Sequence, residues 1–489
     1  MRARPAPPLL LLLLGLVLGL VPATGCASTG PRTPRESPPN IVFILADDMG
    51  YGDARCFNPD AKIPTPHIDS LARGGMRFTD AHAPGSWCVP SRYGLMTGRY
   101  PCRPRNFRPG AGPVIEAERV TVASFLREQG YATAMVGKWH LGFEGGSETD
   151  GRELHGGPVD RGFDHFFGIH ASLDIPPYYY IDGRTPLAPP TERIGASQTA
   201  GWTNIQGAFW REGAIAPGFE HAEVLPRFGQ RAAGYIEELA PSEDPFFLYV
   251  ALAGPHTPWL PENAFAGTSG AGLYGDFVAD VDATVGEILA ALERTGETRD
   301  TLVIFTSDNG PVWYPDDVER FGHSATGPYR GMKSDAWEGG HRMPFVAHWP
   351  ARIEAGATSA QTICFTDVLP TCADAARAEL PVGVAEDGHS FFPILLGASA
   401  VSGREVTVLK ADASVLRSGP WKLITHLGSG GFSMPRRIDP NNGGPSGQLY
   451  HLRTDRGETA NLWSERPDVV ARLQGLLAPY LIPDPSRRK

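Results

Sequence analysis

The stretch IVFILADD, residues 41–48, gives the first indication of the fold. Its first six residues are apolar, which is typical of a strand buried on both faces of an α/β sheet. The run ends abruptly at two adjacent carboxylates, Asp47 and Asp48. Neighbouring carboxylates repel each other unless a cation joins them, so we expect this pair to bind a metal ion rather than to cap a helix.

Three further apolar runs, over residues 131–136, 246–252 and 302–305, end in the same way. The residues that follow them are Gly137-Lys138-Trp139-His140, Gly254-Pro255-His256 and Ser307-Asp308-Asn309-Gly310. Helical patterns separate the runs, which favours an α/β sheet. Ligands of such sheets bind at the carboxyl ends of the strands. We therefore expect the polar residues after the four runs to form one site.

The composition limits the partners of this chain. Its 489 residues are 42% hydrophobic, enough for one large domain and a smaller one with its own core. The formal net charge is −10, whereas proteins that bind nucleic acids or anionic membranes usually carry a basic face. We expect no nucleic-acid partner, and an anionic substrate must meet cations placed locally in the site.

The N-terminus has the layout of an export signal, with Arg2 and Arg4 before an apolar run over residues 9–20. This run is too short to span a bilayer comfortably, and no stretch of spanning length follows it. We expect residues 1–25 to be a signal peptide, and the protein to be periplasmic, a cell-surface lipoprotein or secreted.

Cys26 leaves two outcomes open for this signal. The small residue before it resembles a bacterial lipobox, although Ala23 stands where that motif usually has Leu. Lipid attachment at Cys26 and ordinary signal cleavage are the two alternatives. In either case the Pro/Ser/Thr-rich residues 26–39 are expected to form a flexible tether.

The pattern of the sequence changes after residue 374. Residues 40–374 carry the α/β pattern and are expected to form the catalytic domain. In residues 375–489, short strand-like pieces are joined by Gly-rich turns and followed by a helical pattern at 467–477; the pieces cover residues 406–410, 415–424 and 448–452. We expect a small antiparallel sheet with a helix in this C-terminal subdomain.

The segment CVPSRYGLMTGR, residues 88–99, carries the most specific motif. Its core, Cys-x-Pro-Ser-Arg followed by Thr-Gly-Arg, resembles the signature of the type I sulfatases, which belong to the alkaline phosphatase superfamily. The resemblance covers nearly the whole chain from residue 40, including GPWKL at 419–423 and GETANL at 457–462. It implies an alkaline-phosphatase-like α/β fold with a large mixed sheet, a smaller C-terminal antiparallel sheet, and an arylsulfatase-type enzyme that hydrolyses sulfate monoesters.

Cys88 is the expected source of the nucleophile. A proline two residues later suits the first turn of a helix, whose N-terminus favours an anionic group. The alternative is a buried thiol or half of a disulfide. The resemblance implies that a formylglycine-generating enzyme oxidises the thiol to 3-oxoalanine, whose hydrate has two hydroxyls. One attacks sulfur and releases the alcohol; the other then loses its proton and expels sulfate.

The expected metal ligands are oxygen atoms, from Asp47, Asp48, Asp308, Asn309 and the formylglycine made from Cys88. Hard oxygen ligands suit calcium or magnesium better than zinc. The resemblance favours one calcium ion per site.

Fixed cations are needed to bind the spread charge of a sulfate ester. The resemblance assigns this role to Arg92, Lys138 and Lys333, and Arg92 lies one helical turn beyond Cys88. It also implies catalysis by two histidines. His256, or Lys333 beside it, is the expected acid for the departing alcohol and His140 the base for sulfate release, although which does which stays open.

Asp174 and His323 are candidates for binding the alcohol portion of the substrate. Asp174 lies in SLDIPPY, residues 172–178, which resembles a segment of bacterial carbohydrate-acting members. His323 precedes the loop that carries Lys333. A loop-stabilising role is the alternative for each. Because an exported enzyme meets sulfated glycans, we expect a sulfated carbohydrate or a related sulfated small molecule as substrate.

Two other functions are compatible with the motif. Relatives with the formylglycine motif cleave phosphonate monoesters or phosphodiesters, although Lys138 with His140 and the segment EGGHR at 338–342 look more like a sulfatase. A non-catalytic sulfated-glycan binding protein of the same fold should have lost a ligand or the oxidisable cysteine. None of these residues is missing here.

Overall fold

The computed structural model of this chain describes residues 1, 3, 38–103, 112–147, 151–399, 404–411 and 414–481. The predicted signal peptide lies outside the described residues except for positions 1 and 3, and so does Cys26. Of the predicted tether, only residues 38 and 39 are described. Among the described residues, every helix is too short or too polar to cross a membrane.

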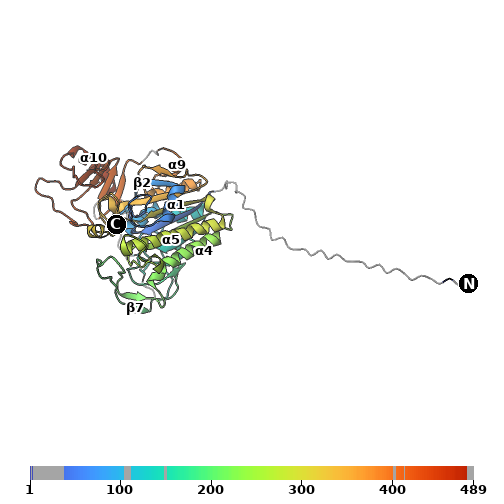
Figure 1. The fold of residues 1–489 in the computed structure, drawn as a ribbon. Coiled ribbons are helices and arrows are strands. Elements are labelled where there is room, and N and C mark those ends of the chain that lie inside the picture. Colours follow the sequence, from blue (N-terminus) through green and yellow to red (C-terminus); the bar gives the residue numbers. More distant parts are fainter. Residues whose placement is uncertain are drawn as a thin grey trace. The chain divides into compact units, whose positions relative to one another are not determined.

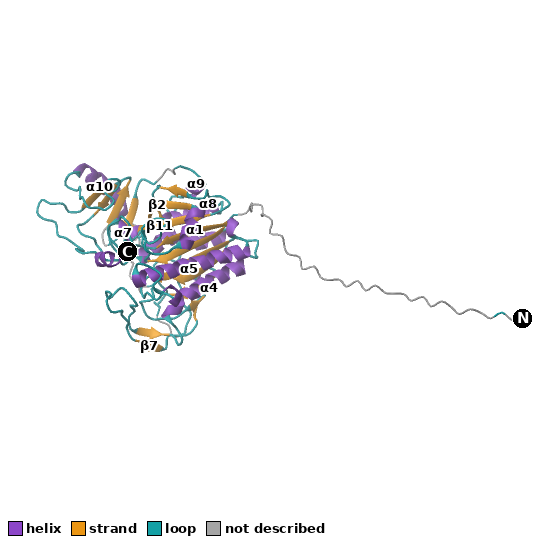
Figure 2. Ribbon diagram, viewed as in Figure 1, coloured by secondary structure: helices purple, strands orange, loops and turns teal. Residues whose placement is uncertain are grey.

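Four parallel strands form the middle of an 11-stranded sheet in the described part of the chain (Figures 1 and 2). In spatial order they are β10 (Thr301–Ser307), β1 (Asn40–Asp47), β9 (Phe246–Pro255) and β3 (Ala132–Lys138). These strands are the four apolar runs of the sequence. All eight residues of β1 are buried, so both faces of the sheet are covered.

The outer strands make the sheet mixed, as expected. Beside β10 lies the antiparallel β11 (Arg342–His348), and β2 (Met76–His82) is antiparallel to β11. Hence β2 runs in the same direction as the central strands and ends at the same edge. The remaining strands are β12 (Ala357–Ser359) and β13 (Ile363–Cys364), which pair with β2, and β4 (His165–Ile169), β5 (Ile181–Asp182) and β6 (Thr185–Pro186), which continue from β3.

Two groups of helices cover the sheet. In one, α4 (Val224–Leu239) and α5 (Gly272–Thr295) lie side by side on β9, with α1 (Pro66–Gly74) packed on α5 and β11 (Figure 1). In the other, α2 (Cys88–Thr97), α3 (Val122–Glu128) and α8 (Val368–Ala375) pack together, with α3 against β3.

Short elements lie in the connections between these strands and helices. They are α6 (Pro315–Phe321), α7 (Glu338–His341), α9 (Phe392–Leu395), the strand pair β7 (Glu192–Ile194) and β8 (Gly213–Ile215), and the 3₁₀ turns η1 (Val159–Arg161), η2 (His221–Glu223), η3 (Asn263–Phe265), η4 (Thr298–Asp300) and η5 (Phe365–Asp367).

The C-terminal antiparallel sheet is confirmed. Its strands, in order, are β14 (Thr407–Lys410), β15 (Ser414–Ser418), β16 (Trp421–Ile424) and β17 (Gln448–His451), and helix α10 (Pro467–Leu481) packs on β15 and β16. The single piece expected over residues 415–424 is a hairpin of two strands. Gly419 has φ of 55° and Pro420 cannot donate to a ladder, so the chain turns there. The domain boundary after residue 374 stays a prediction.

Candidate active site

The carboxyl ends of the central strands bring the predicted residues together. Asp47 ends β1, Lys138 ends β3, and His256 follows β9 directly. Asp308 and Asn309 follow β10 in the same way. Because the four strands are parallel, their ends meet at one edge of the sheet, where α2 adds Cys88 and Arg92 and the loop before α7 adds Lys333.

Unusual backbone angles turn the chain at these strand ends. Asp48, His140 and Ser334 have positive φ values of 67°, 57° and 70°, although none of them is glycine. Such residues cost free energy and persist only where the surrounding structure holds them, which is common in active sites. Gly137 has φ of 114°, and a Cβ there would lie 1.8 Å from the carbonyl oxygen of Ala251. A glycine is required for β3 to pair this closely with β9.

Cys88 is the first residue of α2, as the position of Pro90 predicts. Its thiol is buried, 3.3 Å from the Lys138 Nζ and 3.6 Å from the Asp47 Oδ1. The N-cap residue Trp87 is extended and offers no side-chain cap. The side chain of Trp87 therefore accepts no hydrogen bond from the first backbone N–H groups of α2. These N–H groups favour an anionic group at position 88.

Three buried cations face the carboxylates of the cluster. Lys138 donates to the Asp47 Oδ2 at 2.6 Å, and Lys333 donates to Asp48 at 2.7 Å. Arg92 donates to the Asp308 Oδ2 from its Nε and one terminal nitrogen, at 3.0 and 2.8 Å. The three side chains that were expected to bind sulfate thus lie within reach of the cysteine and the acidic residues.

A cation fits the oxygen-rich side of this cluster. Asp47, Asp48, Cys88 and His256 each offer one ligand atom, and these atoms lie within 4.8 Å of one another. Asn309 donates to the Asp48 Oδ1 at 2.6 Å, while its own Oδ1 is buried and has no hydrogen-bond partner in the part of the chain that the structure describes. A buried acceptor left unpaired is costly, and a bound cation would satisfy it.

The pKa values reflect the crowding of carboxylates. Burial alone would raise the pKa of Asp47, but Lys138, His256 and Arg92 hold it below its usual value. Burial and the neighbouring Asp47 raise the pKa of Asp308 above its usual value. Clustered carboxylates whose pKa values move apart are typical of functional sites.

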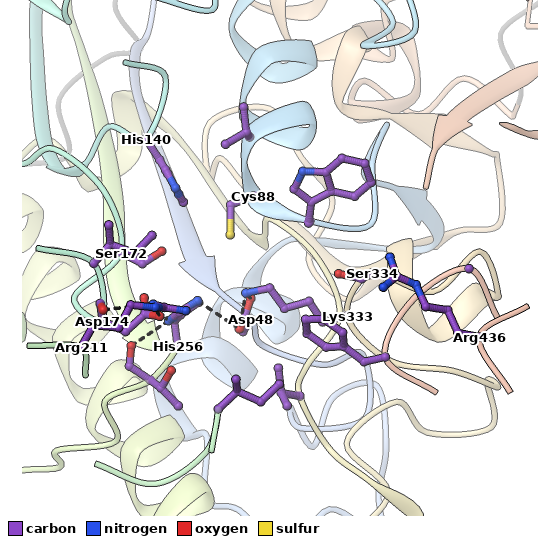
Figure 3. A pocket seen from close by; sticks show the side chains of 18 residues that line it. Asp48, Cys88, His140, Ser172, Asp174, Arg211, His256, Lys333, Ser334 and Arg436 are labelled. Carbon is purple, nitrogen blue, oxygen red and sulfur yellow. Dashed lines mark hydrogen bonds and ion pairs between the residues drawn. The ribbon is translucent and has the colours of Figure 1, made fainter. Parts of the chain in front are cut away.

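Cys88 and His140 are both neutral at pH 7. Burial raises the pKa of the Cys88 thiol to about 12, even though Lys138 is near, so the unmodified thiol is a poor nucleophile. Burial and Lys138 hold the pKa of His140 well below its usual value. Both ring nitrogens of His140 are buried and have no hydrogen-bond partner among the described residues, and the ring lines the same cavity as Cys88 (Figure 3). Burial and the neighbouring cations thus keep His140 unprotonated, with a ring nitrogen that can accept a hydrogen bond.

A cavity of about 460 Å³ opens onto Cys88 and contains Asp174 (Figure 3). Arg211 forms an ion pair with the Asp174 Oδ2, while the Asp174 Oδ1 is buried and accepts no hydrogen bond from the described residues. This oxygen lies 4.0 Å from the Nδ1 of His256. Asp174 can therefore accept a hydrogen bond from a ligand in the cavity.

His323 does not line the cavity. Its Nε2 lies 2.8 Å from the Asp53 Oδ1, and the backbone N–H of Lys62 donates to its Nδ1 at 3.4 Å. The side chain is almost fully buried. With both ring nitrogens engaged by protein groups, this placement favours the loop-stabilising alternative over substrate binding.

Several cavity residues lie outside the sequence prediction, namely Trp87, Ser172, Arg211, Phe432 and Arg436. Trp87 stands directly before the Cys88 motif, which was the only local signal for it. Arg211 belongs to a loop without a motif. Phe432 and Arg436 belong to the C-terminal subdomain, which we expected to have its own core.

Comparisons with known proteins agree with this geometry. The family model "Sulfatase" matches residues 39–378. The N-acetylgalactosamine-6-O-sulfatase of Bacteroides thetaiotaomicron is 34% identical over 506 residues, covering 95% of this chain and 98% of that protein. Human arylsulfatase A is 37% identical over 369 residues, covering 74% and 68% of the two chains.

A solved structure from a study of glycosaminoglycan metabolism by Bacteroides thetaiotaomicron has a TM-score of 0.79 with this chain. The two are 32% identical, and the match covers 91% of this chain and 99% of the other. The fold, the residues at the strand ends and these similarities agree, so this chain belongs to the sulfatase family.

Proposed function

We propose that this sulfatase hydrolyses sulfate esters of carbohydrates, with formylglycine made from Cys88 as the nucleophile and one calcium ion in the site. The observation that carries the proposal is the position of Cys88. It lies at the N-terminus of α2, 3.3 Å from Lys138, and its sulfur and an oxygen of Asp48 lie within 4.8 Å of each other.

The carboxylates Asp47, Asp48 and Asp308 and the amide oxygen of Asn309 would hold the calcium. When bound, this ion would lower the pKa of the hydroxyl at residue 88 and neutralise charge on the ester. A 3-oxoalanine hydrate supplies two hydroxyls, which the neutral thiol of Cys88 cannot.

The remaining residues bind the ester and move protons. Lys138, Lys333 and Arg92 stabilise the negative charge that develops on the sulfate oxygens. The Nε2 of His256 lies 3.7 Å from the Asp48 Oδ2, and the ring lines the cavity, where it can protonate the departing alcohol. His140 is unprotonated, and its ring has no hydrogen-bond partner among the described residues; it is the proposed base for the proton whose loss triggers sulfate release.

A sugar is the proposed alcohol portion. The Asp174 Oδ1 accepts no hydrogen bond from the described residues, and Asp174 lines a cavity large enough for a sugar ring. The relative named N-acetylgalactosamine-6-O-sulfatase supports a sulfated amino sugar as the first substrate to test. Human arylsulfatase A supports an aryl sulfate as the simple reference substrate.

Maturation and export complete the proposal. A formylglycine-generating enzyme would act on residues 88–99, and the signal at residues 1–25 would direct the protein to the periplasm, the cell surface or the medium. Mass spectrometry of the mature N-terminus, expressed in a lipidating host, distinguishes a lipid on Cys26 from ordinary cleavage. A retained, uncleaved signal in that host would contradict export.

The central experiment combines peptide mass spectrometry with activity. Protein coexpressed with a formylglycine-generating enzyme should carry 3-oxoalanine at position 88 and hydrolyse 4-nitrophenyl sulfate and 6-O-sulfated N-acetylgalactosamine. Chelation should abolish turnover, and calcium should restore it better than magnesium. The matched variant Cys88→Ser, which has one hydroxyl, should not turn over.

Each alternative has its own outcome in this experiment. An active preparation that contains only the unmodified thiol would overturn the assignment of formylglycine as the nucleophile. Preference for an aryl phosphonate would favour the phosphonate hydrolase. Fully modified, calcium-loaded protein that binds sulfated glycans without hydrolysing any substrate would favour the binding protein.

A further inference from the structure

One wall of the cavity comes from the C-terminal subdomain. Gly430, Phe432 and Arg436 line it, and they belong to the connection between β16 and β17. In Figure 3, Arg436 lies on the right of Lys333, and Asp174 lies on the left. The cavity is therefore lined both by the catalytic domain and by a loop that carries none of the proposed catalytic residues.

This loop, residues 427–438, is folded on itself by backbone hydrogen bonds. Leu427 and Ile438 form an isolated bridge. Inside it, the N–H of Ser429 donates to the carbonyl of Pro435 at 3.1 Å, and the N–H of Gly430 donates to that of Arg436 at 2.9 Å. The backbone of Arg436 is thus held in place.

The loop is also fixed to the segment that carries Lys333. The N–H of Ala336 donates to the carbonyl of Ser429 at 2.7 Å, and the N–H of Ser433 donates to the Asp335 Oδ1 at 3.1 Å. A Cβ at Gly431 would lie 2.3 Å from the carbonyl carbon of Ser334. Two domains in such close contact present one continuous binding surface.

The exposed side chains of this wall suit a charged sugar. Phe432 is 38% exposed and can pack on the apolar face of a sugar ring. Arg436 is exposed, and its guanidinium matches carboxylates and sulfates with two parallel hydrogen bonds. The ester at Cys88 already has Lys138, Arg92 and Lys333 beside it, so a cation on this wall suits a second anionic group of the substrate.

We propose that loop 427–438 forms a second subsite, where Arg436 binds a carboxylate or sulfate on the sugar next to the sulfated one and Phe432 packs against that sugar. This inference rests on the proposed function, because it requires a sulfated sugar in the cavity at Cys88. It makes an anionic oligosaccharide, rather than a monosaccharide, the preferred substrate.

The test uses three disaccharides that share 6-O-sulfated N-acetylgalactosamine and differ in the neighbouring unit, which is a neutral hexose, a uronic acid or a sulfated hexose. In the wild type, kcat/KM should be higher for the two charged disaccharides than for the neutral one. Arg436→Ala should lower this charged-to-neutral ratio about tenfold, mainly through KM, since a charged hydrogen-bonded contact is lost. Arg437→Ala, an exposed neighbour that does not line the cavity, is the control and should keep the ratio.

The outcomes are separable from those of the proposed function. If Arg436→Ala loses kcat/KM only for the disaccharide with the uronic acid, or only for the one with the sulfated hexose, the affected disaccharide identifies the anion that Arg436 binds. An unchanged ratio in Arg436→Ala, in protein that hydrolyses 4-nitrophenyl sulfate, overturns the subsite alone. Calorimetric binding of the uronic disaccharide to Cys88→Ala protein gives a second readout, in which Arg436→Ala should weaken Kd about tenfold. Equal affinity of both proteins would also overturn it.

Discussion

Lys138 connects the predicted nucleophile to the predicted metal ligands. Its Nζ lies 2.6 Å from the Asp47 Oδ2 and 3.3 Å from the Cys88 Sγ, and its side chain is fully buried. A cation fixed there can stabilise charge that develops on a sulfate oxygen without reorganising. This is the kind of contact whose effect is larger in the transition state than in the bound substrate.

We predict that Lys138→Ala lowers kcat on 4-nitrophenyl sulfate by about 10²- to 10³-fold, the usual effect of removing one such group. Lys138→Arg should recover little, because a planar guanidinium does not fit the space of an ammonium. Steady-state kinetics on correctly modified, calcium-loaded protein measures both. A kcat within threefold of the wild type in Lys138→Ala would contradict the assigned role.

Variants of Asp174 distinguish a substrate-binding role of this residue from a structural one. We predict that Asp174→Ala lowers kcat/KM for a sulfated sugar at least tenfold more than for 4-nitrophenyl sulfate, because the aryl ester lacks hydroxyls for the Asp174 Oδ1. Asp174→Asn keeps one acceptor oxygen, so its kcat/KM for the sulfated sugar should lie between the values for the wild type and for Asp174→Ala. Equal losses on both substrates would place Asp174 among the residues that only support the loop, together with its partner Arg211.

Helix α7 joins the two sheets through buried charges. Glu338 accepts from Lys422 of β16 at 3.1 Å, and Lys422 also lies 2.9 Å from Glu458. Lys422 further contacts the Nε2 of His341 at 3.0 Å, and His82 lies 3.0 Å from the Nδ1 of the same ring. His82, Glu338 and His341 have ligand atoms close enough to hold a metal, but here the Lys422 ammonium contacts both Glu338 and His341.

We predict that Lys422→Met lowers the free energy of unfolding by about 3–5 kcal/mol, because it removes the cation paired with the buried Glu458, whereas Glu338 keeps its ion pair with Arg342. The double variant with Glu458→Gln should recover part of the loss. Urea unfolding followed by fluorescence measures both, with the exposed Lys62→Met as control. A loss below about 1 kcal/mol, the range of surface ion pairs, would contradict the interface role.

Buried histidines make the stability of the whole molecule sensitive to acid. Burial lowers the pKa of His170 to about 4, and its Nε2 donates to the carbonyl of Pro177 at 2.8 Å. The unfolded chain, with a histidine pKa near 6.5, binds more protons than the folded one between pH 4 and 6.5. The buried, neutral His170 therefore leaves the free energy of unfolding at its full value above about pH 6.5, and this free energy decreases as the pH falls towards 4.

We predict that the melting temperature of the wild type falls between pH 6.5 and 4.5, and that it falls less in His170→Gln. Glutamine keeps a donor for Pro177 but takes up no proton, which removes up to about 3 kcal/mol of acid sensitivity. The exposed His155→Gln is the control and should follow the wild type. Identical pH profiles for His170→Gln and the wild type would contradict this account.

Much of the fold was predictable because its signals are local. Each central strand is a continuous apolar run, and burial on both faces requires such a run wherever it occurs in the chain. The turn at Gly419 and Pro420 was missed by the sequence prediction, because the apolar residues on both sides of it have the pattern of a single strand. The pairing order of the strands, with β9 and β10 on either side of β1, was not predictable from the runs themselves.

The sequence by itself determined the side chains on which the proposed chemistry rests: the motif around Cys88 and the charged residues that end each central strand are contiguous with the elements that position them. Only the tertiary structure decided what surrounds this chemistry. Asp174 meets Arg211 across 37 residues, Ser433 meets Asp335 across 98, and His323 turns away from the cavity towards Asp53. These contacts depend on which distant loops pack together, and no local pattern encodes that packing.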